Sequence, residues 1–250
     1  MEEIALKEFD EISEEVIQAD MQQKGYILPE KAIFAFLGDE VIEKYVAQYQ
    51  GQKIASFDSI TKCFDVYSIV YEGQKICLCA ACAGAAGAVM LMEMLIGYGV
   101  KKILAVGSCG CLVPMEENTF LLAEKALRDE GTSFHYQPAS RWIHAEESML
   151  QEVEEKLNGC GIAVKRCAVW TTDAFFRETK DKVEKRKAEG CEAVDMECSA
   201  LIACAKHRGV QFAQLLYTAD TLAESEAYDI RSFGKTAREI GLGICLKAII

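Results

Sequence analysis

Two acidic residues, Asp195 and Glu197, lie close together in the otherwise apolar stretch AVDMECSAL. Burying a carboxylate costs free energy unless it is paired or hydrogen-bonded, so acids in this setting are candidates for ligand binding. Acids also stabilise the first turn of a helix, which leaves capping as a simpler role. A third acid, Asp220 in YTADTL, follows the apolar run QLLY. It is a candidate proton donor or a helix cap.

Two glycine-bearing segments could present polar groups to a ligand. In CAGAAGAV a strand-like run passes into a helical pattern through Gly84 and Gly87, a junction that lets backbone amides approach an anion. Close helix packing requires the same glycines, so both interpretations stand equally. In VGSCGCL a strand-like run ends beside Ser108, and a plain turn explains the glycines but not the hydroxyl. The Gly-Lys-Ser/Thr of a phosphate-cradling Walker loop is missing.

Buried strands and the helices between them must position these residues. Continuous apolar runs of strand length are typical of strands that are buried on both faces. They cover 32–37, 76–82, 102–107, 119–127, 162–170 and 211–219. Helical patterns cover 85–99 and 197–209, the first ending in glycines and the second in cationic residues. This alternation predicts a mostly parallel or mixed sheet covered by helices, with sites at the carboxyl ends of strands.

Length and composition favour a single domain over residues 1–250. The chain has 51% hydrophobic residues and only three prolines, and we find no linker-like or repeated segment. The N-terminal sequence MEEIALKEFDEISEEV is acidic and amphipathic, which predicts a helical extension over residues 1–30. It lacks the basic start and apolar stretch of a secretory signal.

Charge and cysteine usage exclude several classes of partner. A net charge of −12 repels phosphate backbones and anionic lipid, and no window reaches about 18 uninterrupted apolar residues. We therefore expect a cytoplasmic protein without nucleic-acid or membrane partners. Many of the twelve cysteines lie in apolar runs, which is typical of free thiols in a reducing compartment. Cys77, Cys79 and Cys82 are a weak metal-ligand pattern, and we expect no metal site.

Three of these motifs together resemble the nucleoside phosphorylase superfamily. The stretch GAAGAVMLMEMLIGYGVKKILAVGSCGCL is similar to the family's glycine-rich strand, helix and Gly-Ser/Thr-x-Gly strand end. VDMECSAL resembles its Glu-Met-Glu signature, and YTADTL resembles its Ser-Asp-x-Leu element. The nearest branch contains uridine phosphorylase, hexameric purine nucleoside phosphorylase and methylthioadenosine/adenosylhomocysteine nucleosidase. The resemblance implies a three-layer α/β fold with a mixed central sheet flanked by helices.

The resemblance also implies cleavage of the N-glycosidic bond of a nucleoside. Met196 and Glu197 match the residues that hold the ribose, and Asp220 matches the acid that protonates a purine leaving group. Ser108 matches the hydroxyl beside the phosphate or attacking water. The segment TTDAFFRET resembles the part that stacks on and recognises the base, although an ordinary loop would also fit. The base pocket expected from it comprises Phe175, Phe176, Arg177 and Glu178.

The chain departs from the family at the phosphate-binding residues. The family's Gly-Asp-Pro-x-Arg loop is GDEVIE here, with Gly38 retained and Ile42 in place of the arginine. Ala105 replaces a second arginine, and a third, donated by a neighbouring subunit in the family, falls near Lys62. A lysine offers a point charge but no bidentate fork. If phosphate is the nucleophile, its remaining ligands are Ser108, the amides near Gly38 and Gly84, and Lys62.

Hydrolysis is the alternative to phosphorolysis. Nucleosidases of the superfamily also lack these arginines and activate water with a glutamate after the first strand. Glu43, five residues beyond Gly38, is placed similarly, although a surface acid in the helical pattern VIEKYVAQYQ fits it too. A base that activates water and an acid that protonates the leaving group suffice for hydrolysis. A non-catalytic nucleoside-binding protein is a further alternative, but it would have less need of Asp220.

The resemblance implies no cofactor beyond phosphate as a co-substrate. It implies a small-molecule nucleoside partner and a homodimer or hexamer, because the superfamily builds its sites at subunit interfaces. Asp220 favours a purine base, whereas RDEGTS and TTDAFFRET favour the uridine-phosphorylase-like subgroup. The base therefore stays open, as does the choice of ribose or deoxyribose.

Overall fold

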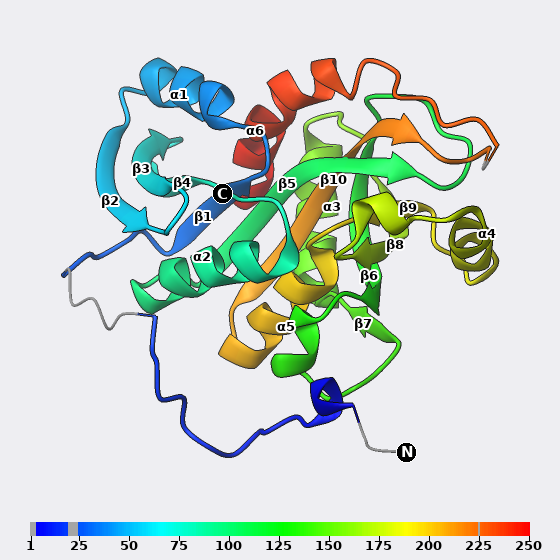
Figure 1. Ribbon diagram of the computed structural model, residues 1–250. Coiled ribbons are helices and arrows are strands. Elements are labelled where there is room, and N and C mark those ends of the chain that lie inside the picture. Colours follow the sequence, from blue (N-terminus) through cyan, green and yellow to red (C-terminus); the bar gives the residue numbers. More distant parts are fainter. Residues whose placement is uncertain (1–3, 20–24, 225) are drawn as a thin grey trace.

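The computed structural model describes residues 4–19, 25–224 and 226–250. Its centre is a ten-stranded mixed sheet (Figure 1). The strands are β1 (Lys31–Ala35), β2 (Gln52–Asp58), β3 (Cys63–Tyr71), β4 (Gln74–Ala80), β5 (Lys102–Cys111), β6 (Phe120–Asp129), β7 (Trp142–His144), β8 (Lys165–Thr172), β9 (Ala193–Asp195) and β10 (Gln211–Thr221). The mixed α/β fold expected from the sequence is confirmed.

The sheet closes on itself at one end. β10 pairs in parallel with β5 and antiparallel with β6, and the path from β6 through β8 and β9 returns to β5. β1 and β4 extend the sheet in parallel from β5, and β3 and β2 add an antiparallel edge. The carboxyl ends of the parallel strands β1, β4, β5 and β10 therefore lie on one side of the molecule, whereas β8 and β9 run antiparallel to β5.

Helices cover both faces of the sheet and produce the three layers. The helices are α1 (Asp39–Gln48), α2 (Ala85–Gly97), α3 (Glu147–Gly159), α4 (Lys180–Ala188), α5 (Cys198–Arg208) and α6 (Lys235–Ile249). Alternate residues of a strand point to opposite faces. Phe34 of β1 accordingly packs in the core beneath α2 and α5, whereas its neighbour Ile33 packs in the core beneath α1, α3 and α6.

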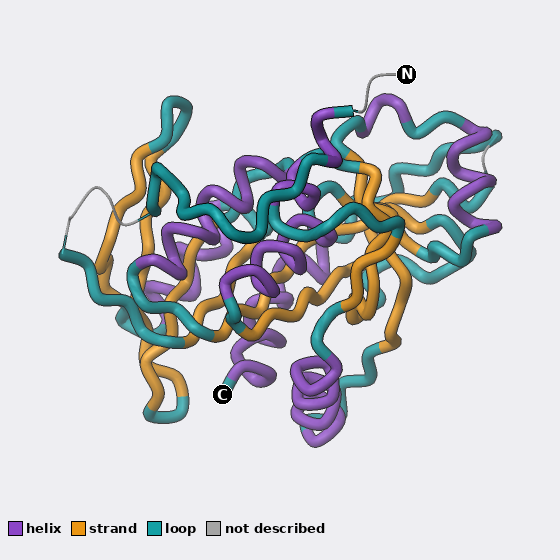
Figure 2. The backbone as a smooth tube through the Cα atoms, turned by 90° about the horizontal axis from the view of Figure 1, so that it is seen from below, coloured by secondary structure: helices purple, strands orange, loops and turns teal. Residues whose placement is uncertain are grey.

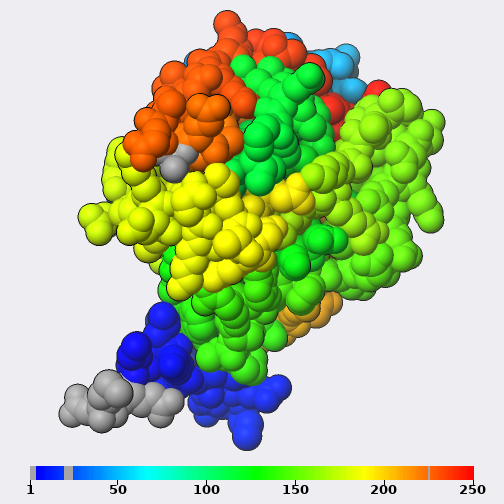
Figure 3. All heavy atoms as spheres, turned by 90° about the vertical axis from the view of Figure 1, so that its right-hand side faces the viewer, coloured from blue at the N-terminus to red at the C-terminus, as the bar shows by residue number. Residues whose placement is uncertain are grey.

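The N-terminal segment differs from the helical extension expected over residues 1–30. Within residues 4–19 and 25–30 the helical structure is one 3₁₀ turn, η1 (Ala5–Lys7), and the rest is extended or looped (Figure 2). The segment runs across the face formed by α2 and α5, and η1 contacts the 3₁₀ turn η2 (Thr132–His135) at the edge of the molecule (Figure 3). Ile12 and Val16 are each 93% exposed, so this part of the segment buries little apolar surface that would stabilise a helix. Without tertiary packing an isolated helix of this length is only marginally stable.

None of the described helices is long and apolar enough to cross a membrane.

Candidate active site

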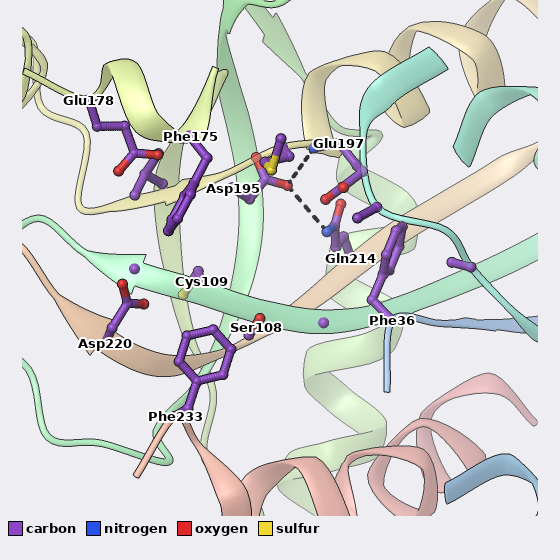
Figure 4. A pocket seen from close by; sticks show the side chains of 16 residues that line it. Phe36, Ser108, Cys109, Phe175, Glu178, Asp195, Glu197, Gln214, Asp220 and Phe233 are labelled. Carbon is purple, nitrogen blue, oxygen red and sulfur yellow. Dashed lines mark hydrogen bonds between the residues drawn. The ribbon is translucent and has the colours of Figure 1, made fainter. Parts of the chain in front are cut away.

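A cavity of about 410 Å³ opens at the carboxyl ends of the strands. Its lining comes from segments far apart in the sequence, which the sheet brings to one edge (Figure 4). The side chains labelled in this view are Phe36, Ser108, Cys109, Phe175, Glu178, Asp195, Glu197, Gln214, Asp220 and Phe233. Met196 lines it as well. Ser108, Met196, Phe175, Glu178, Glu197 and Asp220, all predicted as site residues, are therefore brought together.

Asp195 and Glu197 have different roles, helix capping for the first and ligand contact for the second. Asp195 accepts hydrogen bonds from the Cys198 amide at 2.7 Å and from Thr171 Oγ1 at 2.8 Å, so its carboxylate caps the start of α5. Glu197 Oε1 instead accepts a hydrogen bond from the Gly84 amide at 2.5 Å. Both carboxyl groups line the cavity, but Asp195 is engaged by α5 and Thr171, so Glu197, which is 8% exposed, is the candidate for contact with a ligand.

The environment of Glu197 opposes its ionised form. Burial is the main cause that raises the pKa of Glu197. The charge of Asp195 raises this pKa further, and the hydrogen bond from the Gly84 amide lowers it. Burial also raises the pKa of Asp195, against the hydrogen bonds that this carboxylate accepts. A ligand that brings hydroxyl donors or positive charge to Glu197 would favour its ionisation.

Gly84 does not line the cavity itself. Its φ of +94° at the start of α2 is a backbone conformation that favours glycine, and it aims the amide at Glu197. This amide is therefore engaged by a protein carboxyl group. Gly84 supports the expected sugar-binding residue rather than offering a free donor to an anion.

A second pair of carboxyl groups lies at the other end of the cavity. Asp220 is 5% exposed near the end of β10, and Glu178 faces the same space beside Phe175 (Figure 4). Burial, followed by the charge of Asp220, raises the pKa of Glu178 to about 7, although Lys182 opposes the shift. Asp220 belongs to β10, whereas α6 begins only at Lys235, so helix capping does not explain this acid.

The four residues expected in the base pocket are split by the local helix geometry. Phe175–Arg177 form the 3₁₀ turn η3, in which residues three apart lie on the same side. Phe175 and Glu178 accordingly line the cavity, whereas Phe176 is 94% exposed and Arg177 is also exposed. Phe176 contacts Phe175 edge to face and lines a neighbouring hollow with Tyr228.

Three residues proposed for the nucleophile side lie outside the cavity lining. Gly38 precedes α1 with a φ of +84°. Lys62 forms an ion pair with Asp39 at 2.5 Å, which holds it beside the start of α1. Glu43 is exposed on α1, because its neighbour Ile42 faces the core and turns the next side chain to solvent. The described structure therefore does not bring Glu43 to the cavity.

Sequence reasoning missed other residues of the lining, including Phe36, Gln214 and Phe233. Gln214 Nε2 donates to Asp195 at 3.4 Å, and its Oε1 is buried without a partner among the described residues. A glutamine inside the apolar run FAQLLY was the available signal. Phe233 lies in a loop outside every motif, and no pattern in the sequence pointed to it.

Comparison with known proteins decides the family. The family model described as the phosphorylase superfamily matches residues 30–249. The chain belongs to the phosphorylase superfamily. A DeoD-type purine nucleoside phosphorylase from Bacillus cytotoxicus is 24% identical over 221 residues, which cover 85% of this chain and 91% of the relative.

Solved structures of the phosphorylase superfamily share the fold. Purine nucleoside phosphorylase from Toxoplasma gondii has a TM-score of 0.75 at 22% identity, covering 88% of this chain and 90% of its own. Uridine phosphorylase from Vibrio fischeri also gives 0.75 at 22% identity, with coverages of 89% and 92%. A 5'-methylthioadenosine/S-adenosyl homocysteine nucleosidase from Campylobacter jejuni gives 0.72 at 18% identity, with 88% and 98%. The resemblance stated from the motifs is confirmed.

In this superfamily member, the free energy of unfolding should depend on pH through Glu178. Its pKa of about 7 in the folded protein lies above the value of about 4.3 of an exposed glutamate. Between these values the folded protein binds more protons than the unfolded chain, so stability falls as pH rises from about 4.3 to about 7. Glu178→Gln removes this loss. We expect a gain of about 2–4 °C in Tm relative to wild type at pH 8 and much less at pH 4.5, allowing for solvent screening.

Thermal unfolding of both proteins across this pH range measures the effect. Glu155→Gln, which removes an exposed acid on α3, is the matched control and should follow the wild-type curve. Parallel curves for Glu178→Gln and wild type would contradict the assigned shift.

Proposed function

We propose that this protein cleaves the N-glycosidic bond of a nucleoside by phosphorolysis, giving a free base and a pentose 1-phosphate. The observation that carries the proposal is the placement of Glu197 and Asp220 in one cavity, whose lining also includes the aromatic ring of Phe175. An acceptor for sugar hydroxyls and a proton donor for the base are the two groups that this bond cleavage requires.

The sugar binds against Met196 and Glu197 in this proposal. Glu197 accepts hydrogen bonds from the sugar hydroxyls while positive charge develops on the sugar ring in an oxocarbenium-like transition state. Because burial disfavours the ionised carboxylate in the free protein, attraction to this charge is strongest in the transition state. Gly84 holds the carboxyl group in place through its amide.

The base binds between Phe175 and the acids Asp220 and Glu178. Asp220 transfers a proton to a ring nitrogen as the glycosidic bond breaks, so that the base leaves as a neutral molecule. Phosphate attacks the anomeric carbon from the side of Ser108 and forms the new C–O bond. No metal or organic cofactor takes part in this scheme.

Phosphate is favoured as the nucleophile because relatives named as purine nucleoside and uridine phosphorylases match most of the chain. A hydrolytic nucleosidase is the second candidate, and one observation favours it. Ile42 and Ala105, which replace two phosphate-binding arginines, are buried in the core, so neither position carries a cation. Hydrolysis would need a base to activate water, and Glu43 is exposed outside the lining.

We expect release of free base to require phosphate. The experiment is an assay of purine and pyrimidine nucleosides, with ribose and with deoxyribose, at saturating phosphate and with phosphate rigorously removed. Formation of pentose 1-phosphate only in the first arm supports the proposal. Equal release without phosphate would replace it with the nucleosidase, and no release in either arm would favour a non-catalytic nucleoside-binding protein.

The remaining expectations are part of the same proposal. We propose a cytoplasmic enzyme that forms a homodimer or hexamer, as the superfamily resemblance implies. Sedimentation of the purified chain would test the assembly.

A further inference from the structure

The start of α6 brings an arginine to the turn after β1. Arg238 Nε donates to the Leu37 carbonyl at 2.7 Å. A Cβ atom at Gly38 would lie only 2.6 Å from Arg238 Nη2, so the guanidinium occupies the space that a side chain at this turn would fill. The residue after this turn begins α1, whose N-terminal end carries partial positive charge. α6 runs beside β5 and α1 in the fold (Figure 1).

Arg238 is also coupled to the cavity through Tyr217. Burial raises the pKa of Tyr217, and both the charge of Arg238 and a hydrogen bond with Ser108 oppose this shift. Tyr217 and Ser108 are directly paired across β10 and β5. Ser108 lines the cavity, as does Phe36, which stands two residues before Gly38. The guanidinium therefore lies outside the cavity lining, on the side that Ser108 and Phe36 form.

The guanidinium of Arg238 has one hydrogen bond to the described part of the chain, from Nε to the Leu37 carbonyl. Among the described residues no carboxylate pairs with it, and its Nη groups donate no hydrogen bond to a protein acceptor. The acid at the same turn, Asp39, is paired with Lys62 at 2.5 Å. Arg238 is solvent-exposed, so an incoming ion can reach it. A planar guanidinium with free donors suits a tetrahedral oxyanion.

We infer that Arg238 binds the phosphate co-substrate beside Ser108 and takes the place of the missing family arginines. The inference rests on the proposed phosphorolysis. It names a residue that could bind phosphate although Ile42 and Ala105 stand where the family has arginines. Lys62 is paired with Asp39 within the protein, and a lysine cannot form the bidentate contact that a guanidinium makes with phosphate.

Steady-state kinetics with phosphate and nucleoside varied separately test this role. Arg238→Gln is expected to raise KM for phosphate about 10- to 100-fold, the scale of losing a charged hydrogen-bond donor, with KM for the nucleoside changed less than about threefold. Arg238→Lys keeps the positive charge but lacks the bidentate donors of a guanidinium. Its KM for phosphate should therefore lie between those of wild type and Arg238→Gln. The matched control is Lys247→Gln, which removes an exposed positive charge from the far end of α6 and should leave both constants unchanged.

Calorimetric titration of inorganic phosphate into wild type and Arg238→Gln separates the outcomes. Phosphate-dependent wild-type activity with unchanged phosphate affinity in the variant overturns the role of Arg238 alone. Equal increases in both KM values would also overturn it, because they indicate a merely structural arginine. Phosphate-independent activity without phosphate binding overturns the proposed phosphorolysis and this inference together. If Arg238→Gln fails to unfold cooperatively, the result for Arg238→Lys decides, and an unchanged KM for phosphate there overturns the inference.

Discussion

Glu197→Gln is expected to lower kcat by roughly one to three orders of magnitude, the scale of losing one electrostatic contact in the transition state. Glutamine keeps the size of the side chain and an oxygen that can accept from the Gly84 amide, so the fold and the cavity should persist. It cannot become negative as positive charge develops on the sugar. The loss should therefore appear in kcat more than in KM.

Single-turnover kinetics of base release, together with thermal unfolding of the same samples, measure this effect. Asp195→Ala is the informative contrast, because Asp195 lines the same cavity but its carboxylate is engaged by the Cys198 amide at the start of α5. We expect that variant to lose about 1 kcal/mol of unfolding free energy. Unchanged turnover in a folded Glu197→Gln protein would refute the assignment of Glu197 to the sugar.

Asp220→Asn should impair cleavage of ordinary purine nucleosides by about 10²- to 10⁴-fold, the usual contribution of a general acid. An asparagine can still hydrogen-bond to the base but cannot transfer the proton that the leaving group needs. A substrate with a good leaving group, such as a nucleoside of a 7-methylated purine that already carries positive charge, needs no such proton. Its cleavage should be much less affected by the substitution.

The ratio of kcat/KM values for the two substrates is the measurement, since it cancels general effects on folding and sugar binding. Asp181→Asn, which removes an exposed acid from α4, should leave the ratio at its wild-type value. Equal losses for both substrates would show that Asp220 contributes to binding or structure and not to proton transfer. Glu178 at its raised pKa is the neighbouring acid that could replace it, so the double variant with Glu178→Gln would expose any residual transfer.

The strands and helices that form the central layers were predictable because each carries a strong local pattern. The apolar runs at 32–37 and 102–107 became β1 and β5, and the helical pattern at 85–99 became α2. β2 and β3 were not predicted, because their residues alternate between buried and exposed and include charged side chains, so neither forms a continuous apolar run. The amphipathic N-terminal pattern was misleading, because Ile12, Val16 and Ile17 stay exposed and so bury little apolar surface that would stabilise a helix.

By itself, the sequence determined the family and the chemical identity of the acids at the site. Glu197 and Asp220 stand in motifs whose residues are contiguous, and the strands before them are buried, so their place at the sheet edge follows from local pattern. Only the tertiary structure decided which neighbours share the cavity. The geometry of η3 separated Phe175 and Glu178 from Phe176 and Arg177, and the docking of α6 brought Arg238 to Gly38 across 200 residues of chain. Such contacts depend on how helices pack against the sheet. The packing energy that selects them is the sum of many small contacts over the whole core, so no single segment of the sequence reveals it.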